Sequence, residues 1–407
     1  MKLVVLTPHF APDVAPTGLV MTRIVEELAA LGHRLEVITA LPWYRDHSVE
    51  PSWRGKLVRY EDVPWGRIVR LHPFPAPDKR ALGRRALAFG AFTALAIRKG
   101  RRGGRVDGVL AVSPPLTLAL AGARVAEARG RPFVFNVQDV FPDVTIELGY
   151  LRNPVAIAAA KRLESFCYRR ADAITVLSED LRTNLAEKTD PHKIHVVPNF
   201  VDSETITPQP TENGYRREHG LSGKRVIMYA GNVGLSQSLE LLIDAAAALA
   251  HETDLVFVIN GAGAARDGLR ERARGMGNVV FVDMQPTERL PEVLAAADIH
   301  VVVLKKGLAH SSVPSKTYSI LAAGRPIVAS VDEGSEVARI LERAGAGLAV
   351  PPEDPEAFTK AIRTLLDDRD EAEAMGRAGR AFVEDWASPA AIARRYEELF
   401  AHSRQGA

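Results

Sequence analysis

Apolar runs alternate with amphipathic segments along the whole chain. In the first half, strands are expected at 2–8, 34–40, 108–113, 132–137, 173–178 and 195–199. Between the first two, residues 19–31 have helical periodicity, and Gly32 follows as a helix-ending glycine. Strands at this spacing, with helices between them, are typical of a parallel sheet covered on both faces.

The pattern is interrupted once and then restarts. Residues 201–222 are polar, contain Pro and Gly, and are expected to form a linker. Beyond them, strands are expected at 226–231, 254–260, 279–283, 299–304 and 326–330, with a helix at 238–250. We therefore predict an α/β protein with two tandem doubly wound, Rossmann-like parallel-sheet domains, 1–200 and 223–385. Such sheets bind ligands at the carboxyl ends of their strands, which predicts a site in the cleft between the domains.

The composition excludes several classes of protein. Of the 407 residues, 46% are hydrophobic and 25% are charged, which excludes a disordered, collagen-like or coiled-coil chain. The single cysteine, Cys167, excludes a disulfide framework and a multi-cysteine metal site. The apolar start is short and is interpreted as a strand, not a signal peptide, and no apolar run reaches the length of a membrane span. We expect a cytoplasmic protein.

The charge is distributed unevenly. Residues 1–200 hold 29 Lys and Arg against 20 Asp and Glu, a net charge of +9, and the remainder has a net charge of −7. Much of the excess lies in 79–105, where nine basic residues and no acidic residue surround an apolar centre with Phe89 and Phe92. This pattern favours an interfacial helix on an anionic membrane over a buried helix with basic ends. Nucleic acid is not expected, because no nucleic-acid motif accompanies the patch.

Glycines follow several of the predicted strands. Gly18 lies at the end of the 8–18 loop and directly before a helix, Gly231 and Gly234 flank the first turn of the second domain, and Gly263 follows its second strand. Backbone amides at such turns can approach a phosphate, although ordinary tight turns have the same composition. The 8–18 loop is not a GxGxxG fingerprint, so a nicotinamide cofactor is disfavoured.

Charged residues follow other predicted strands. Lys305 and Lys306 follow the strand at 299–304, and a helix expected to start at Pro314 and Ser315 carries Lys316. Together they could hold a diphosphate leaving group. Asp139, after the strand at 132–137, is the best candidate among the carboxylates of its loop. His9 has no metal-ligand spacing with other residues, and we expect neither a metal nor a cofactor.

These segments together resemble the family-four retaining glycosyltransferases of the GT-B fold over nearly the whole chain. The motifs that carry the resemblance are SPP (113–115), VQDVFP (137–142), VVPNFVD (196–202), YAGN (229–232), GAG (261–263), ADIHVVVL (297–304) and AAGRPIVAS (322–330). Within that family, the chain is similar to the bacterial colanic-acid and O-antigen enzymes, some of which transfer N-acetylated aminosugars such as N-acetylfucosamine. The resemblance implies an N-terminal acceptor domain, a C-terminal domain for a sugar nucleotide, commonly UDP-linked, and a last helix, here 386–407, that crosses back to the first domain. It also implies metal-independent transfer with retention.

Some positions depart from the family pattern. Asn232 and Gln237 stand where many relatives have Arg and Lys, and Ser311 and Ser319 occupy the two positions of the Glu-x7-Glu signature. Gln138 replaces a histidine that often precedes the aspartate. With these departures, the resemblance implies that Lys316, together with Lys305 or Lys306, binds the diphosphate. It implies that Glu336 contacts the ribose or the sugar and that Asp139 contacts the acceptor.

The sequence therefore predicts a glycosyltransferase at the inner face of the membrane that uses a nucleotide sugar and a polyprenyl-diphosphate-linked acceptor in surface polysaccharide biosynthesis. The expected catalytic residues are Asp139, Lys316 and Lys305. The expected substrate-binding residues are Gly18, Gly231, Asn232, Gly234, Gln237, Gly263, Ser315, Ser319 and Glu336. Two alternatives remain open: a sugar-nucleotide 2-epimerase on the same fold, and a sugar-nucleotide-binding subunit that has lost catalysis.

Overall fold

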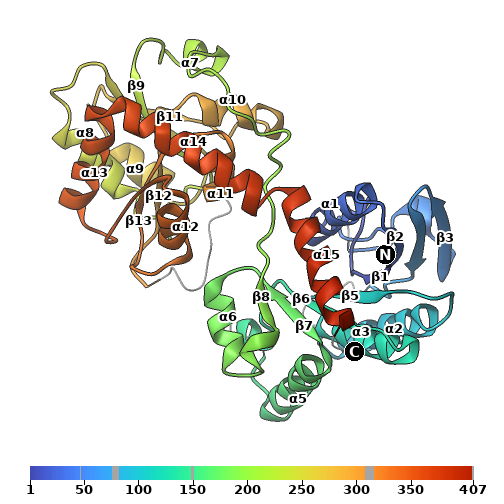
Figure 1. Ribbon diagram of the computed structural model, residues 1–407. Helices are drawn as coiled ribbons and strands as arrows, with labels where there is room; N and C mark the ends of the chain where they lie inside the picture. The colour runs from blue at the N-terminus through green and yellow to red at the C-terminus, as the bar shows by residue number, and fades with distance from the viewer. Residues whose placement is uncertain (46, 76–81, 148–150, 308–315, 406–407) are drawn as a thin grey trace. The chain divides into compact units, whose positions relative to one another are not determined.

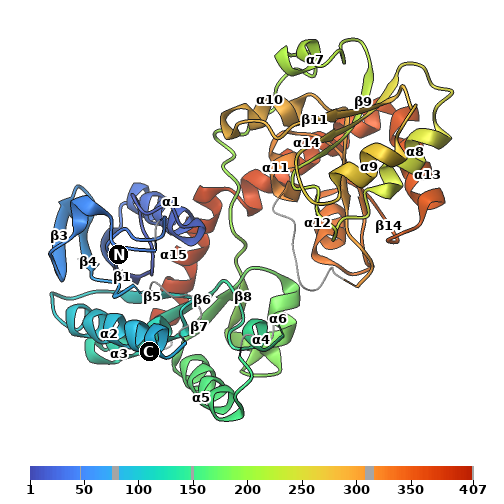
Figure 2. The same cartoon turned by 180° about the vertical axis from the view of Figure 1, so that it is seen from behind.

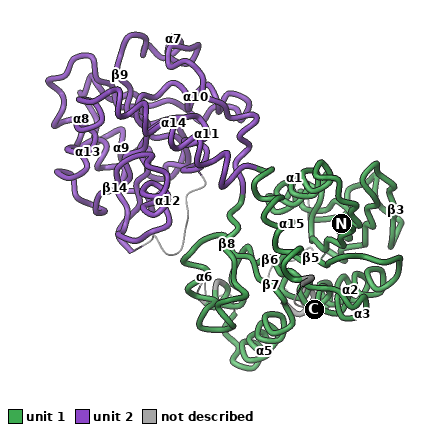
Figure 3. Tube along the Cα trace, in the orientation of Figure 1, with its two compact units in different colours: residues 1–199, 389–407 green, residues 200–388 purple. Residues whose placement is uncertain are grey.

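The chain forms two compact units, residues 1–199 with 389–407 and residues 200–388 (Figure 3). The structure is a computed structural model that describes residues 1–45, 47–75, 82–147, 151–307 and 316–405. The stretch expected to be a linker, 201–222, belongs to the second unit and includes a short helix, α7 (Gly214–Glu218), whose Tyr215 is fully buried. Each unit is described separately below.

The first unit is a sheet with helices on both faces (Figures 1 and 2). Its strands are β1 (Lys2–Leu6), β2 (Arg34–Ala40), β3 (Val58–Val63), β4 (Gly66–Leu71), β5 (Gly108–Ser113), β6 (Phe133–Val137), β7 (Ala173–Val176) and β8 (Ile194–Val196). Its helices are α1 (Pro16–Ala30), α2 (Leu82–Gly100), α3 (Leu116–Arg129), α4 (Asp143–Glu147), α5 (Pro154–Arg170), α6 (Glu179–Ala186) and α15 (Pro389–Gln405). The strand order is β3-β4-β2-β1-β5-β6-β7-β8. All neighbouring strands are parallel except β3 and β4, an antiparallel hairpin at the edge that the hydrophobic pattern did not predict.

The helix α15 belongs to the first unit although it ends the described chain. It packs against α1, and its Tyr396 and Phe400 are almost completely buried. A Cβ atom on Gly108 would lie 2.5 Å from the Phe400 ring, so this ring packs directly on the backbone of β5. Tyr396 accepts a hydrogen bond of 2.8 Å from the Asn136 side chain on β6. The core of the first unit is therefore completed by residues that lie far apart along the chain.

The second unit has the same architecture. Its strands are β9 (Arg225–Ala230), β10 (Leu255–Asn260), β11 (Val279–Val282), β12 (Ile299–Val303), β13 (Ile327–Ser330) and β14 (Gly347–Val350). Besides α7, its helices are α8 (Glu240–Ala248), α9 (Arg266–Arg272), α10 (Leu290–Ala295), α11 (Lys316–Ala322), α12 (Glu336–Ala344), α13 (Pro355–Asp367) and α14 (Arg369–Trp386). The strands are parallel in the order β11-β10-β9-β12-β13-β14. The predicted α/β class with two doubly wound sheets is confirmed.

Alternate residues of β9 pack on opposite faces of this sheet. Val226 and Met228 belong to a core with residues of α10, α11, α12 and α14, whereas Ile227 and Tyr229 belong to a core with α8, α9 and α13. A strand buried on both faces needs apolar residues at every position, which is why these strands are continuous β-branched runs. The helices begin at polar caps: the Ser335 and Asp354 side chains accept backbone hydrogen bonds at the starts of α12 and α13.

Part of the basic segment 79–105 lies outside the described residues, and the rest forms α2 and the turn after it. Phe92 and Ala96 on α2 are buried in the core of the first unit, so the expectation that Phe92 faces a membrane is wrong. Residues four apart in sequence lie on the same face of a helix, and in α2 that face covers the sheet. The exposed positively charged residues at its end are Arg98, Arg101, Arg102 and Arg105. Among the described residues, no helix is long and apolar enough to cross a membrane.

Candidate functional site

The strand order of the second unit creates a crevice at the carboxyl ends of β9 and β12. From β9 the chain runs through α8 to β10 on one side, and from β12 it runs through α11 to β13 on the other side. Ligands of doubly wound sheets bind at such a switch point. Gly231 follows β9 directly, and Lys305 follows β12 after one intervening residue. These predicted site residues therefore lie at the edge of the sheet where a ligand is expected.

Three glycines hold the loops after β9 and β10 together. Gly231 and Gly263 have φ angles of +137° and +156°, and the Gly231 N–H donates to the Asn260 carbonyl at 2.9 Å. A Cβ atom on Gly261 would lie 1.9 Å from the Gly231 carbonyl oxygen, and one on Gly263 would lie 2.2 Å from that of Val233. Gly261 and Gly263 are therefore required for the packing of the two loops, and Gly231 for its positive φ angle, independently of any ligand.

Asn232, Gly234 and Gln237 meet in the loop after β9. The Gln237 side-chain oxygen accepts a hydrogen bond of 3.0 Å from the Gly234 N–H. A Cβ atom on Gly234 would lie 2.9 Å from both the Asn232 amide nitrogen and the Gln237 oxygen. Gln237 therefore orders the loop, in which the three residues lie side by side.

Lys316, the first described residue of α11, reaches this loop. Its Nζ donates a hydrogen bond of 2.6 Å to the Tyr229 hydroxyl and lies 3.9 Å from the centroid of the Tyr229 ring. The Tyr229 hydroxyl in turn donates to the Asn232 carbonyl at 2.5 Å. A Cβ atom on Gly231 would be 3.4 Å from Nζ, so the ammonium group lies beside the first turn of the site. Tyr229 was not predicted as a site residue.

The electrostatic surroundings of Lys316 favour an anionic ligand. Desolvation by burial lowers the pKa of Lys316 from its ordinary value to about 8. Within the described part of the chain, no acidic side chain forms an ion pair with it. Burial raises the pKa of Tyr229, so its hydroxyl stays protonated and continues to donate to Asn232. A partly buried ammonium group without a carboxylate partner is stabilised when a phosphate supplies the missing negative charge.

The other residues predicted for this site are placed less centrally. The Lys305 N–H donates to the Ser236 carbonyl at 3.0 Å, which connects the end of β12 to the loop after β9. Ser319 is half-buried on α11, one turn after Lys316. Glu336 begins α12 and forms an ion pair of 2.9 Å with Arg339 on its own helix. Ser311 and Ser315, and with them the expected helix start at 314–315, lie outside the described residues.

In the first unit, the corresponding switch point lies between β1 and β5. The loop after β1 is built around His9, whose Nδ1 lies 2.7 Å from a carboxylate oxygen of the buried Asp13. The His9 ring stacks on Trp43 with 5.6 Å between ring centroids. A Cβ atom on Gly18 would lie 2.9 Å from the His9 Cβ, so this glycine admits the histidine beside α1. The sequence interpretation included Gly18 but missed the pair of His9 and Asp13.

Asp139 lies in the loop after β6, at the carboxyl edge of the same sheet. Its side chain is exposed, yet partial desolvation by the surrounding protein raises the pKa of its carboxyl group. The preceding residue, Gln138, donates a hydrogen bond of 2.7 Å to Asn136 and accepts one of 2.9 Å from Asn199. Asp139 is thus held next to an ordered amide network. Among the described residues, no group of three His, Cys, Asp or Glu side chains is placed to hold a metal ion.

Comparison with known proteins identifies the family of this chain. Residues 17–199 match the "Glycosyl transferase 4-like domain", and residues 224–368 match "Glycosyl transferases group 1". A relative from Pseudomonas aeruginosa, the probable glycosyltransferase WbjE, is 31% identical over 301 residues, which are 72% of this chain and 75% of the relative. The chain is a group 1 glycosyltransferase.

Other proteins similar to this glycosyltransferase agree with that assignment. The putative colanic acid biosynthesis glycosyl transferase WcaI of Escherichia coli (strain K12) is 29% identical over 379 residues, 90% of this chain and 92% of the relative. Among solved structures, Anabaena HepE in complex with UDP has a TM-score of 0.65 at 15% identity and covers 99% of this chain and all of its own. Sucrose-phosphate synthase from Thermosynechococcus elongatus has a TM-score of 0.65 at 18% identity, with full coverage of both chains. Both structures confirm the predicted GT-B fold of this glycosyltransferase.

Proposed function

We propose that this glycosyltransferase moves a sugar, with retention, from a UDP-sugar to a polyprenyl-diphosphate-linked glycan in surface polysaccharide biosynthesis. The name of WcaI supports the polysaccharide role, and the UDP bound to HepE supports the choice of donor base. The second unit, which carries Lys316 and the loop after β9, would bind the donor. The first unit, which carries Gly18 and Asp139, would bind the acceptor.

One observation carries the proposal for the donor site: the ammonium group of Lys316 lies beside a glycine turn at the switch point and has no carboxylate partner among the described residues. In this proposal, the charge of Lys316 supplies the attraction for a diphosphate. Gly231, Asn232, Gly234, Gln237 and Gly263 would line the nucleotide, and Lys305, Ser315, Ser319 and Glu336 would complete its surroundings.

The proposed reaction depends on stabilisation of the nucleoside diphosphate that leaves the sugar. The bond between the anomeric carbon and the diphosphate oxygen breaks, and the acceptor hydroxyl oxygen bonds to the same face of that carbon. The hydroxyl proton passes to the departing diphosphate, whose developing negative charge Lys316 stabilises. Asp139 would orient the acceptor by accepting a hydrogen bond, and desolvation raises the pKa of its carboxyl group.

A donor screen tests the proposal. Thermal unfolding should be shifted upward by UDP and UDP-sugars and less by GDP-, dTDP- and CMP-sugars, because only a ligand of the folded state stabilises it. GDP-mannose is the main alternative donor, since one relative named a GDP-mannose-dependent mannosyltransferase is 28% identical over 277 residues, 66% of this chain. A selective shift with GDP-mannose would replace UDP in the proposal. Absence of a shift with every nucleotide would favour a protein that has lost catalysis.

We further propose that the protein lies on the inner face of the membrane through the exposed arginines in the last turn of α2 and in the turn that follows it. The variant Arg98→Gln/Arg101→Gln/Arg105→Gln should reduce flotation with vesicles containing anionic lipid at least tenfold, because each cation near such a surface contributes about 1 kcal/mol. Arg274→Gln/Arg369→Gln/Arg377→Gln, a matched set of exposed arginines in the second unit, is the control and should float as the wild type does. Equal flotation of both triple variants would exclude α2 as the contact.

A further inference from the structure

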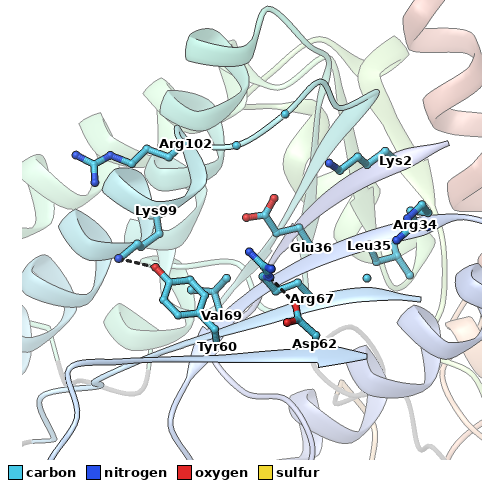
Figure 4. Close-up of a pocket in the computed structure, with 13 residues that line it drawn as sticks. Lys2, Arg34, Leu35, Glu36, Tyr60, Asp62, Arg67, Val69, Lys99 and Arg102 are labelled. Carbon is cyan, nitrogen blue, oxygen red and sulfur yellow. Dashed lines mark hydrogen bonds and ion pairs between the residues drawn. The ribbon is translucent and has the colours of Figure 1, made fainter. Parts of the chain in front are cut away.

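A cavity of about 500 Å³ lies at the amino-end edge of the sheet in the first unit (Figure 4). The starts of β1 and β2, the β3–β4 hairpin and the turn after α2 form its walls. The carboxyl ends of the parallel strands, where the acceptor is proposed to bind, lie at the opposite edge. The cavity is large enough for a small organic ligand and is not part of the proposed transfer site.

The cavity is rich in positive charge. Its charged lining residues are Lys2, Arg34, Arg67, Lys99 and Arg102 against Glu36 and Asp62. Arg67 donates a hydrogen bond of 2.8 Å to Asp62, and Lys99 donates one of 2.7 Å to the Tyr60 hydroxyl. Neither Lys2 nor Arg34 forms a side-chain ion pair within the described residues. The five cationic side chains of the lining therefore outnumber its two carboxylates.

The turn that closes one side of the cavity is held in place by Arg129 of α3. Its Nε donates to the Gly100 carbonyl at 2.9 Å and its Nη1 to the Gly104 carbonyl at 2.5 Å, and its Nη2 donates to the Arg102 carbonyl. Three carbonyls bound by one guanidinium group define the path of this turn. The wall of the cavity is consequently an ordered part of the fold.

Glu36 is the exception among these charges. Figure 4 shows its carboxyl group turned into the cavity, as are Lys2 and Arg67, whereas the guanidinium group of Arg102 points outward. Burial raises the pKa of Glu36, although the neighbouring charges of Arg129, Lys2 and Arg67 oppose that shift. A protonated Glu36 would donate a hydrogen bond to an anion, whereas an ionised one would repel it.

We propose that this cavity binds the phosphate group of a small phosphate ester, either free in solution or as the headgroup of an anionic lipid. Guanidinium groups match phosphate geometry, and Lys2 and Arg34 lack carboxylate partners that would have to be displaced. The exposed Arg98, Arg101 and Arg105 are close in sequence to the lining residues 99 and 102–104, and in this proposal they would attract an anionic surface. Such binding would attach or regulate the protein at a point remote from the transferred sugar.

Titration with sn-glycerol 3-phosphate, in the presence of excess UDP to occupy the proposed donor site, tests the soluble source. Lys2→Gln/Arg67→Gln should weaken binding about tenfold. Arg124→Gln/Lys360→Gln removes the same charge at exposed positions outside the cavity and should stay within about twofold of the wild type. Both double variants should retain glycosyl transfer, which separates this proposal from the proposed function. Equal affinity of wild type and Lys2→Gln/Arg67→Gln would overturn it.

Glu36→Gln gives a gain of function that misfolding cannot imitate. Removing the carboxylate charge should tighten binding about three- to tenfold near neutral pH. In the wild type, affinity relative to Glu36→Gln should recover as the pH falls through the raised pKa of Glu36, because protonation removes the same charge. If the ratio of the wild-type affinity to the Glu36→Gln affinity did not change with pH, Glu36 would be excluded from the site.

Vesicles of phosphatidylcholine, with and without phosphatidylglycerol, distinguish the two sources. If the headgroup is the ligand, Lys2→Gln/Arg67→Gln weakens flotation with the anionic vesicles, and glycerol 3-phosphate competes with them. If the ligand is a free ester, glycerol 3-phosphate binds while flotation does not depend on these two residues. Failure of both probes to distinguish the variant from the wild type would remove the cavity as a phosphate site.

Discussion

Replacing Lys316 with alanine should lower kcat/KM for glycosyl transfer about a hundredfold, because loss of one preorganised charge at a developing anion has an effect of this size. The fold should persist, since the side chain is only partly buried and contacts the Tyr229 hydroxyl and ring. Steady-state kinetics with the donor found in the screen would measure the effect. Lys360→Ala, which removes an exposed lysine of α13, is the control and should leave turnover unchanged. Unchanged turnover in Lys316→Ala would remove this residue from the mechanism.

The same lysine predicts a pH signature that a structural role would not produce. Because burial lowers the pKa of Lys316 to about 8, the free enzyme loses the ammonium charge as the pH rises through that value. The kcat/KM of the wild type should therefore fall above about pH 8, and in Lys316→Ala this decline should be absent. A diphosphate favours the charged form, so donor binding above pH 8 should take up protons, which calorimetry in buffers of different ionisation enthalpy detects.

Replacing Gly263 with alanine should destabilise the second unit by about 2–5 kcal/mol, because strain and overpacking act together. The residue has a φ angle of +156°, and its new Cβ atom would lie 2.2 Å from the Val233 carbonyl oxygen. Relief of that clash must separate the loops after β10 and β9, which should also weaken nucleotide binding. Thermal unfolding and a nucleotide titration would measure both effects.

Gly268 in α9 is the matched control for this substitution. A Cβ atom there would have no neighbour within 4 Å, and alanine is a better helix former by up to about 1 kcal/mol. Gly268→Ala should therefore unfold at the same temperature as the wild type or higher. If Gly263→Ala behaved like this control, the two loops would not depend on each other as the geometry indicates.

The hydrophobic pattern predicted the strands that are continuous apolar runs, including the edge strands β8 and β11, and missed the β3–β4 hairpin and the edge strand β14. The run at 226–231 has apolar residues at every position and corresponds to β9. The hairpin strand β3 is mostly polar and exposed, so its sequence carries no such run, and β14 has only four residues. In α2, the spacing of Phe92 and Ala96 already contained the signal for a buried face, which the density of basic residues concealed.

The sequence predicted those parts of the candidate site whose positions follow from the order of the strands. Gly231 and Gly263 follow neighbouring parallel strands, so their proximity follows from the order of the sheet. Tyr229 was missed because a tyrosine in a buried strand is ordinarily core, and only the structure shows its hydroxyl bonded to Lys316. Glu336 and Arg339 are three residues apart on a helix, and this spacing alone would have suggested their ion pair.

The return of α15 to the first unit has a consequence for biosynthesis. Residues 200–388 are contiguous, so the second unit can assemble its core as soon as that stretch has left the ribosome. The first unit is made earlier but cannot be finished, because Tyr396 and Phe400, which pack on β5 and β6, are translated about 200 residues after Asn199. During that interval the apolar surface around Gly108 stays uncovered, and the nascent chain carries a binding surface for chaperones until α15 emerges.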